Sequence, residues 1–370
     1  MTAQNLKDFL ACGAFLQIGP DLFKLLVGPF TRHTLLDIKS SKEASWLYMP
    51  KFWDFMGSAT INAQSAPIED VYQAHAAYIL SREEFIGFLS LSKGVCPEIQ
   101  WKNVNAGQFQ AQFDWSQQMF SENKLQKTVP IIRQQGDVNF SEENLLWCMQ
   151  KLIADRIFGW SYGFFSEGQG FVGHTPEVLV QWNEADLQLK TVALAGTYPK
   201  TPRAFDEIVN DQKVIQEHQI VIDDIERQLQ GLNFHPQVLQ GETDVLELKY
   251  LLHLMTDFEL EVSKRDQVFD VIRSLHPTAA MGLYPRSEEA FTTFKKFSLQ
   301  QERGYFASPF ALIEEDQISC VVSIRNLMFT KTGVEIFSGC GVTSESHYQS
   351  ELDELQGKRD SVKKMLGLLN

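Results

Sequence analysis

Strand-like and helix-like segments follow one another in an irregular order along this chain, and that order restricts the folds open to it. β-rich runs lie at 168–182, 187–200, 303–313, 318–329 and 333–342. Segments whose apolar residues recur at helical spacing lie at 139–160, 206–230 and 346–369. Because strands and helices do not alternate one by one, we predict an α+β fold whose large antiparallel β-sheets form a sandwich covered by helices. The last three runs predict an antiparallel meander.

The size of the chain permits either two domains or one large sandwich. Its 370 residues are 44% hydrophobic, which allows a sizeable core, and no repeat or linker marks a boundary. We therefore treat residues 1–110 as the N-terminal part of the same α+β unit. The motifs that carry chemistry all lie in residues 111–370.

Composition excludes several classes of function. The net charge is −14 and no Lys/Arg-rich run offsets it, so we expect no nucleic-acid partner. No apolar run is long enough to span a membrane, and the first residues lack the pattern of a secretory signal, so we expect a cytoplasmic protein. Five scattered cysteines fit reduced thiols better than a disulfide framework or a zinc site.

The predicted C-terminal helix carries charged residues on the stripe that should be buried. At about 100° per residue, Glu351, Glu354 and Lys358 share one stripe with Leu355 and Val362. Ionised groups removed from water need a partner such as a metal ion, a ligand or an opposite charge. The alternative is that these glutamates are simply solvated.

The predicted helix at 206–230 repeats this pattern. Glu217 lies between Val214 and Val221 on the same apolar strip. Two helices that each point carboxylates at the core are consistent with a Mg²⁺ site, because Mg²⁺ prefers oxygen ligands and typically takes one or two carboxylates.

The sequence that leads into the predicted C-terminal helix resembles the signature of a known family. SGCGVTSESHYQSELDELQGK is similar to the G-x-G-[IV]-x-x-x-S-x-x-x-x-E-x-x-E-x-x-x-K signature of the chorismate-utilising enzymes: anthranilate, aminodeoxychorismate, isochorismate and salicylate synthases. Further blocks agree in order: GFVGHTPEVLV, ALAGTYPK, QKVIQEH, SLHPTAAMGLYP and RGYFASPFALIEEDQISCVVSIRN. The resemblance covers about 120–368, and it implies that 111–370 is a chorismate-binding catalytic region with the fold of anthranilate synthase large subunits.

The resemblance also implies a metal site. Glu217 and Glu354 resemble the carboxylates that hold Mg²⁺, which in turn holds the ring carboxylate of chorismate. Glu351 resembles a carboxylate that reaches the metal through water, and Lys358 resembles the lysine beside it. Val214 departs from the family, because many members have an acidic residue there.

Other positions resemble substrate-binding residues of the family. Arg325 and Tyr305 match the residues that grip the pyruvyl carboxylate, where a guanidinium can form a two-pronged contact. The remaining substrate-binding positions are Ala195, Gly196 and Thr197 of ALAGT, His253 at the ring, and the backbone around Gly339, Cys340 and Gly341.

The reaction depends on the nucleophile that the family member delivers to C2 of chorismate. Lys127 resembles the lysine base of water-using members, and Glu177 resembles the acid that protonates the departing C4 hydroxyl. Pro130 interrupts the lysine strand, so Lys124 is an alternative base. This combination favours an isochorismate synthase.

Three alternatives stay open. They are a salicylate synthase, an anthranilate or aminodeoxychorismate synthase component, and a protein that binds chorismate without turnover. Ala195 stands where many aminodeoxychorismate synthases have a nucleophilic lysine, and the chain contains no glutaminase. We therefore expect no glutaminase subunit, and we expect a monomer.

Overall fold

The computed structural model describes residues 1–34, 45–54, 70–249 and 251–369. Two nine-stranded sheets form its framework, and every pairing between their described strands is antiparallel. This arrangement confirms the predicted α+β class with large antiparallel sheets. Residues 35–44 and 55–69 of the N-terminal range lie outside the described residues.

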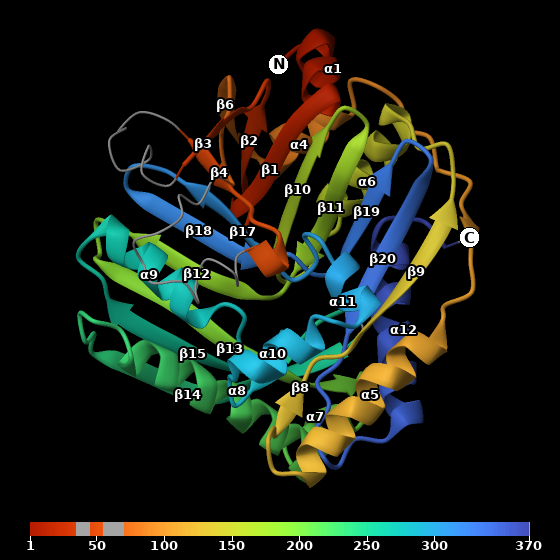
Figure 1. Cartoon of the computed structure of the whole chain (residues 1–370). Coiled ribbons are helices and arrows are strands. Elements are labelled where there is room, and N and C mark those ends of the chain that lie inside the picture. Colours follow the sequence, from red (N-terminus) through yellow and green to blue (C-terminus); the bar gives the residue numbers. More distant parts are fainter. Residues whose placement is uncertain (35–44, 55–69, 250, 370) are drawn as a thin grey trace.

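Both sheets combine strands from distant parts of the chain (Figure 1). The first contains, in spatial order, β6 (Ala76–Ser81), β2 (Leu22–Val27), β1 (Cys12–Gly19), β10 (Trp160–Ser166), β11 (Gln169–Thr175), β19 (Asn326–Thr330), β20 (Gly333–Gly339), β9 (Ile131–Asp137) and β7 (Gln100–Trp101). The second contains β14 (Val238–Glu247), β15 (Leu251–Glu261), β13 (Gln188–Pro199), β12 (Val178–Asn183), β18 (Gln317–Val322), β17 (Pro309–Ile313), β4 (Trp46–Tyr48), β5 (Val71–Gln73) and β3 (Thr31–His33). A small sheet pairs β8 (Lys127–Thr128) with β16 (Leu283–Tyr284).

Helices complete the hydrophobic cores. The first sheet packs on α1 (Ala3–Ala11), α4 (Arg82–Leu89), α6 (Glu142–Ala154) and the end of α12 (Tyr348–Met365). The other helices are α5 (Ala106–Ser121), α7 (Ala204–Ile208), α8 (Gln212–Gln230), α9 (Arg265–Leu275), α10 (Glu288–Phe294) and α11 (Ser298–Glu302). Where the sheets face each other, a third core contains Leu16, Phe171 and Phe310, all from strands. No helix within the described ranges is long and apolar enough to cross a membrane.

The long helix predicted at 206–230 begins later than expected. Asp211 caps α8, because its side chain accepts a hydrogen bond from the Val214 amide, and the preceding residues form the separate short helix α7. The final helix is also shorter than 346–369. It ends at Met365, two residues before Gly367 adopts a positive φ of 66°.

The predicted meander of three runs is wrong, because the run at 318–329 divides between the two sheets. β18 pairs with β17 in the second sheet, whereas β19 pairs with β20 in the first. The chain changes sheets at 323–325, where Arg325 has a left-handed φ of 54°. This crossing places Arg325 where the two sheets diverge.

Candidate active site

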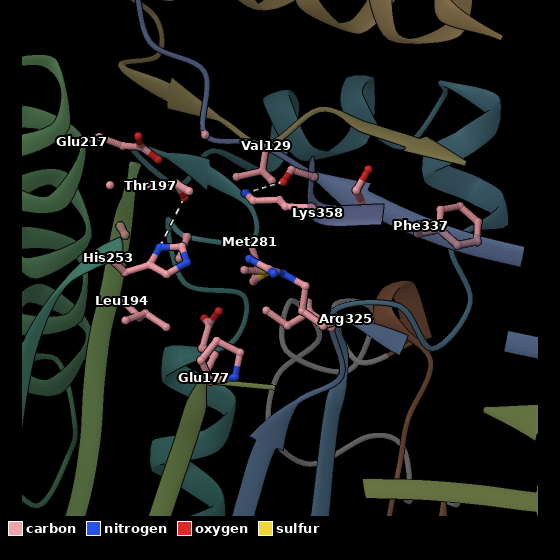
Figure 2. A pocket seen from close by; sticks show the side chains of 18 of the residues that line it. Val129, Glu177, Leu194, Thr197, Glu217, His253, Met281, Arg325, Phe337 and Lys358 are labelled. Atoms are coloured by element: carbon pink, nitrogen blue, oxygen red, sulfur yellow. Dashed lines mark hydrogen bonds between the residues drawn. The ribbon is translucent and has the colours of Figure 1, made fainter. Parts of the chain in front are cut away.

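A cavity lies where the second sheet meets α8, α12 and the small sheet. Its empty volume is about 700 Å³, including the solvent-filled opening. It collects residues from distant parts of the sequence (Figure 2). The predicted site residues that line it are Lys127, Glu177, Ala195, Gly196, Thr197, Glu217, His253, Arg325, Gly339, Gly341 and Lys358. Tyr305, Cys340, Glu351 and Glu354 are not part of this lining.

Lys127 and Glu217 form an ion pair at the wall of the cavity. The Lys127 side chain is 1% exposed, and its Nζ lies 3.2 Å from Oε1 of Glu217 on α8. Gly341 passes so close to the pair that a Cβ atom there would overlap the Glu217 carboxylate and lie 2.7 Å from Cε of Lys127. Glycine is therefore required at 341 for these three segments to converge.

The structure separates the two candidate lysine bases. Lys124 is 61% exposed, forms an ion pair with Glu122 and lies away from the cavity, whereas Lys127 lines it. Pro130 does not disrupt β8, because it falls between β8 and β9. Thr128 keeps two backbone hydrogen bonds with Val342, of 3.0 and 2.8 Å.

Glu177 lies between β11 and β12 and is 4% exposed. Burial raises the pKa of its carboxyl group to about 8, although the positive charges of Lys127, Lys358 and Arg325 act in the opposite direction. The carboxyl group is consequently protonated near pH 7. Figure 2 shows it on the opposite side of the cavity from Glu217.

The β13 wall is shaped by a bulge at Gly196, whose φ is 76°. The bulge brings Thr197 opposite His253 of β15, and Thr197 Oγ1 lies 3.3 Å from His253 Nδ1 (Figure 2). Burial holds the pKa of His253 well below its usual range, so the imidazole is neutral. Its Nε2 has no hydrogen-bond partner and remains available to a ligand.

Arg325 presents a guanidinium to the cavity without a counter-ion. Its Nη1 donates a hydrogen bond of 3.1 Å to Ser361 Oγ, and none of the described carboxylates forms an ion pair with it. Burial lowers the pKa of Arg325 to about 10, which leaves it charged at neutral pH. A carboxylate is the group that such a guanidinium binds best.

Lys358 and the neighbouring glycines form the adjacent wall. Lys358 Nζ donates a hydrogen bond of 2.9 Å to the carbonyl of Gly339 and pairs with Glu354 Oε1 at 2.6 Å. The side chain of Cys340 faces the core, and its N–H already donates to the carbonyl of Pro130. Gly339 and Gly341 therefore contact the cavity, while Cys340 packs behind them.

Glu351 lies behind the lining, in a network with lysines. It is 1% exposed and pairs with Lys213 at 2.6 Å. Burial and the neighbouring Glu354 raise its pKa, while Lys213 acts in the opposite direction. Each predicted metal ligand thus has its own lysine: Lys127 for Glu217, Lys213 for Glu351 and Lys358 for Glu354.

These carboxylates fit Mg²⁺ by donor type. They supply hard oxygen atoms from two facing helices, and Mg²⁺ commonly takes only one or two carboxylates together with water and substrate oxygens. In the part of the chain that the structure describes, no three acidic, His or Cys side chains form a closed metal cage. A bound Mg²⁺ would share these carboxylates with the lysines that contact their Oε1 atoms.

Tyr305 lies apart from the other predicted residues. Its ring packs on Phe171, with 5.5 Å between ring centroids, and it borders a different hollow on the first sheet. The next residue, Phe306, lines the cavity instead. The segment 303–308 is a turn rather than the expected strand, so alternation along a strand could not identify which aromatic ring faces inward.

Two charged residues at the site were not predicted. Arg303 lines the cavity, and Lys213 neutralises the buried Glu351. Both lie in sequence blocks that carry the family resemblance, RGYF and QKVIQEH. Their place in those blocks could have marked them as candidate site residues.

Comparison with known proteins identifies the family of this chain. The family model described as chorismate binding enzyme matches residues 60–367. Isochorismate synthase MenF of Bacillus subtilis is 28% identical over 227 residues, which are 59% of this chain and 47% of that protein. The vibriobactin-specific isochorismate synthase of Vibrio cholerae is 27% identical over 231 residues, 60% of this chain and 57% of its own. The matched regions thus span about half the length of these relatives.

Solved structures share the fold along nearly the whole chain. MenF of Escherichia coli superposes with a TM-score of 0.75 at 18% identity, covering 98% of this chain and 91% of that one. Anthranilate synthase component I of Streptococcus pneumoniae gives a TM-score of 0.72 at 12% identity, covering 96% and 92%.

Proposed function

The chain belongs to the chorismate-binding enzymes, and on this premise we propose that it is an isochorismate synthase, a magnesium-dependent isomerase of chorismate. The observation that carries the proposal is that Lys127 and Glu177 line one cavity. Lys127 pairs with Glu217, which lies across the cavity from Glu177 in Figure 2. Water-adding chemistry needs a base and an acid on either side of the substrate ring. The curated relatives named isochorismate synthase support the same reaction.

The charges of the lining suit a substrate with two carboxylates. Four cationic side chains of the described residues reach the cavity, namely Lys127, Arg303, Arg325 and Lys358. Of the acids in the lining, Glu177 is neutral at pH 7 because burial raises its pKa to about 8, so it adds no negative charge to the cavity. Positive charges in a secluded site attract and orient a dianion.

In the proposed reaction, Lys127 accepts a proton from the water that attacks C2 of chorismate. A lysine serves as a base only when it releases its own proton readily, and loss of a carboxylate partner favours that release. The ion pair with Glu217 is the contact that must loosen. This requirement links the base to the metal site.

Glu177 is the proposed general acid. Its carboxyl group donates a proton to the C4 hydroxyl, which departs as water while the ring double bonds shift. The high pKa of Glu177 keeps that proton in place at neutral pH. One water is added and one is released, so the product is the isomer isochorismate.

The remaining groups bind and orient the substrate. Glu217 and Glu354 would hold Mg²⁺, with Glu351 behind them, and the bound ion would neutralise the ring carboxylate. Arg325 would bind the pyruvyl carboxylate, while the neutral His253 with Thr197 would contact the ring. Ala195, Gly196, Gly339, Gly341 and Lys358 complete the proposed pocket.

The cellular setting is part of the proposal. We place the enzyme in the cytoplasm, where its five free cysteines would stay reduced. We further propose that it acts as a monomer and without a glutaminase subunit, because water rather than ammonia is the nucleophile.

A product assay tests the proposal. Purified protein is incubated with chorismate and Mg²⁺, and the products are separated by chromatography. Isochorismate as the accumulating product supports the assignment. Salicylate would show that pyruvate elimination follows, anthranilate formed with ammonia would make it an ammonia user, and unchanged chorismate would reject turnover altogether.

A further inference from the structure

Arg303 is a buried cation at the wall of the cavity. It is 1% exposed and belongs to the turn between α11 and β17. Its Nη1 donates to Gln300 Oε1 at 2.9 Å and its Nε donates to the carbonyl of Phe306 at 3.2 Å. The guanidinium carbon lies 3.5 Å from the ring centroid of Phe52. These contacts hold the group in one orientation.

This guanidinium has no counter-ion in the described part of the chain. Within the described ranges, no ion pair involves Arg303, and its Nη2 has no hydrogen-bond partner. Two other arginines do have carboxylate partners. Arg82, which is 3% exposed, pairs with Asp21 at 2.7 Å, and Arg286 pairs with the fully buried Asp224 at 2.9 Å. Burying a cation without a partner costs free energy, so a fold that retains one needs a compensating gain.

The charge persists at neutral pH. Burial lowers the pKa of Arg303 to about 9, so the group is still protonated at pH 7. Gln300, which accepts its hydrogen bond, is itself fixed by a bond of 2.8 Å to Gln112 Oε1 on α5. These hydrogen bonds preorganise the positive charge at the cavity wall.

We propose that Arg303 is a positioning residue whose fixed positive charge, without a carboxylate partner among the described residues, attracts and orients the dianionic substrate in the cavity. This inference rests on the proposed function. Lys127 and Lys358 already have carboxylate partners, whereas Arg303 and Arg325 have none among the residues that the structure describes. Mg²⁺ and Arg325 are the proposed direct partners of the two carboxylates, so Arg303 adds a further positive charge at the cavity wall. The free-energy cost of burying that charge is offset when the dianionic ligand enters.

The test compares substitutions that differ in charge. For Arg303→Gln we expect KM for chorismate to rise at least about tenfold with kcat within about threefold, because binding rather than chemistry loses the charge. Arg303→Lys, which keeps the charge, should stay within about threefold of the wild-type KM. Thermal unfolding checks that each variant is folded, and Arg303→Met replaces Arg303→Gln if the latter is not.

Arg82→Gln is the matched control. It removes a buried arginine that has a carboxylate partner and lies outside the cavity, so it should lower the unfolding temperature and leave KM unchanged. A folded Arg303→Gln or Arg303→Met with wild-type KM overturns the proposal, and so does an equal rise in KM with Arg303→Lys. If the wild type converts no chorismate, the proposed function fails instead.

Discussion

The Nζ atom of Lys127 lies 3.2 Å from Oε1 of Glu217, which joins the proposed base to a proposed metal ligand. The lysine comes from the short strand β8 and the glutamate from α8, and both lie against the backbone of Gly341. Whatever binds Glu217 therefore also changes the surroundings of Lys127. Base and metal site should respond together to mutation.

We predict that Lys127→Gln removes water addition while leaving chorismate binding nearly intact. Loss of a general base typically costs about a hundredfold or more in kcat. Chorismate turnover and calorimetric binding measure the two effects. Lys124→Gln is the control and should retain wild-type kcat, because Lys124 is 61% exposed and outside the cavity. The reverse result would move the base to Lys124.

We predict that Gly341→Ala disables the site without unfolding the protein. The added methyl group would collide with the Glu217 carboxylate and press on Lys127, so both kcat and the affinity for Mg²⁺ should fall. Gly357→Ala is a suitable control, because Gly357 lies inside α12 and its added methyl group would meet no described atom within 4 Å beyond its chain neighbours and the adjacent helix backbone. It should raise the free energy of unfolding by about 0.5–1 kcal/mol and preserve activity. Equal activity of both variants would contradict the packing argument.

The sequence predicted those features that depend on local periodicity. The α+β class and the inward position of Glu217 followed from apolar spacing, and α6 (Glu142–Ala154) lies within the helical segment predicted at 139–160. Features set by tertiary contacts were not predictable. Nothing local indicated that the chain would change sheets at Arg325, or that a turn would direct Phe306 rather than Tyr305 into the cavity. The unpaired state of Arg303 is likewise a property of the assembled fold.

We predict that Lys213→Met destabilises the metal-free protein and that Mg²⁺ reverses much of the loss. The substitution leaves the Glu351 carboxylate buried without its lysine. Because Lys213 is 30% exposed, we expect a loss of about 2 kcal/mol rather than the ~3–5 kcal/mol of a fully buried pair. Denaturant unfolding with and without millimolar Mg²⁺ measures this.

The surface pair Lys190 and Glu259 provides the control for that experiment. Lys190→Met should change the free energy of unfolding by less than about 1 kcal/mol and should be insensitive to Mg²⁺, since Lys190 is 56% exposed. If Mg²⁺ stabilises Lys213→Met no more than wild type, Glu351 does not belong to the metal site.

We predict an alkaline limit on turnover that is set by Glu177. With a pKa of about 8, the acid is protonated below that pH and loses its proton above it, so kcat should fall about tenfold per pH unit beyond pH 8. Glu177→Gln should reduce kcat at least about a hundredfold at pH 7, and its residual kcat should not fall with pH above pH 8. If kcat of Glu177→Gln still falls above pH 8, the titration belongs to another group.

The same carboxyl group should make stability depend on pH in the direction opposite to that of most acids. Its folded pKa of about 8 exceeds the ordinary value of 4.5, so between these pH values the folded state holds the proton and the unfolded state has lost it. Stability from Glu177 is therefore present below about pH 4.5 and is lost as the pH rises towards 8. Glu177→Gln cannot titrate, so its free energy of unfolding relative to wild type should increase by at least about 2 kcal/mol between about pH 5 and pH 8. Urea unfolding of both proteins across this range measures the difference, and a constant difference would mean that Glu177 is ionised in the folded protein.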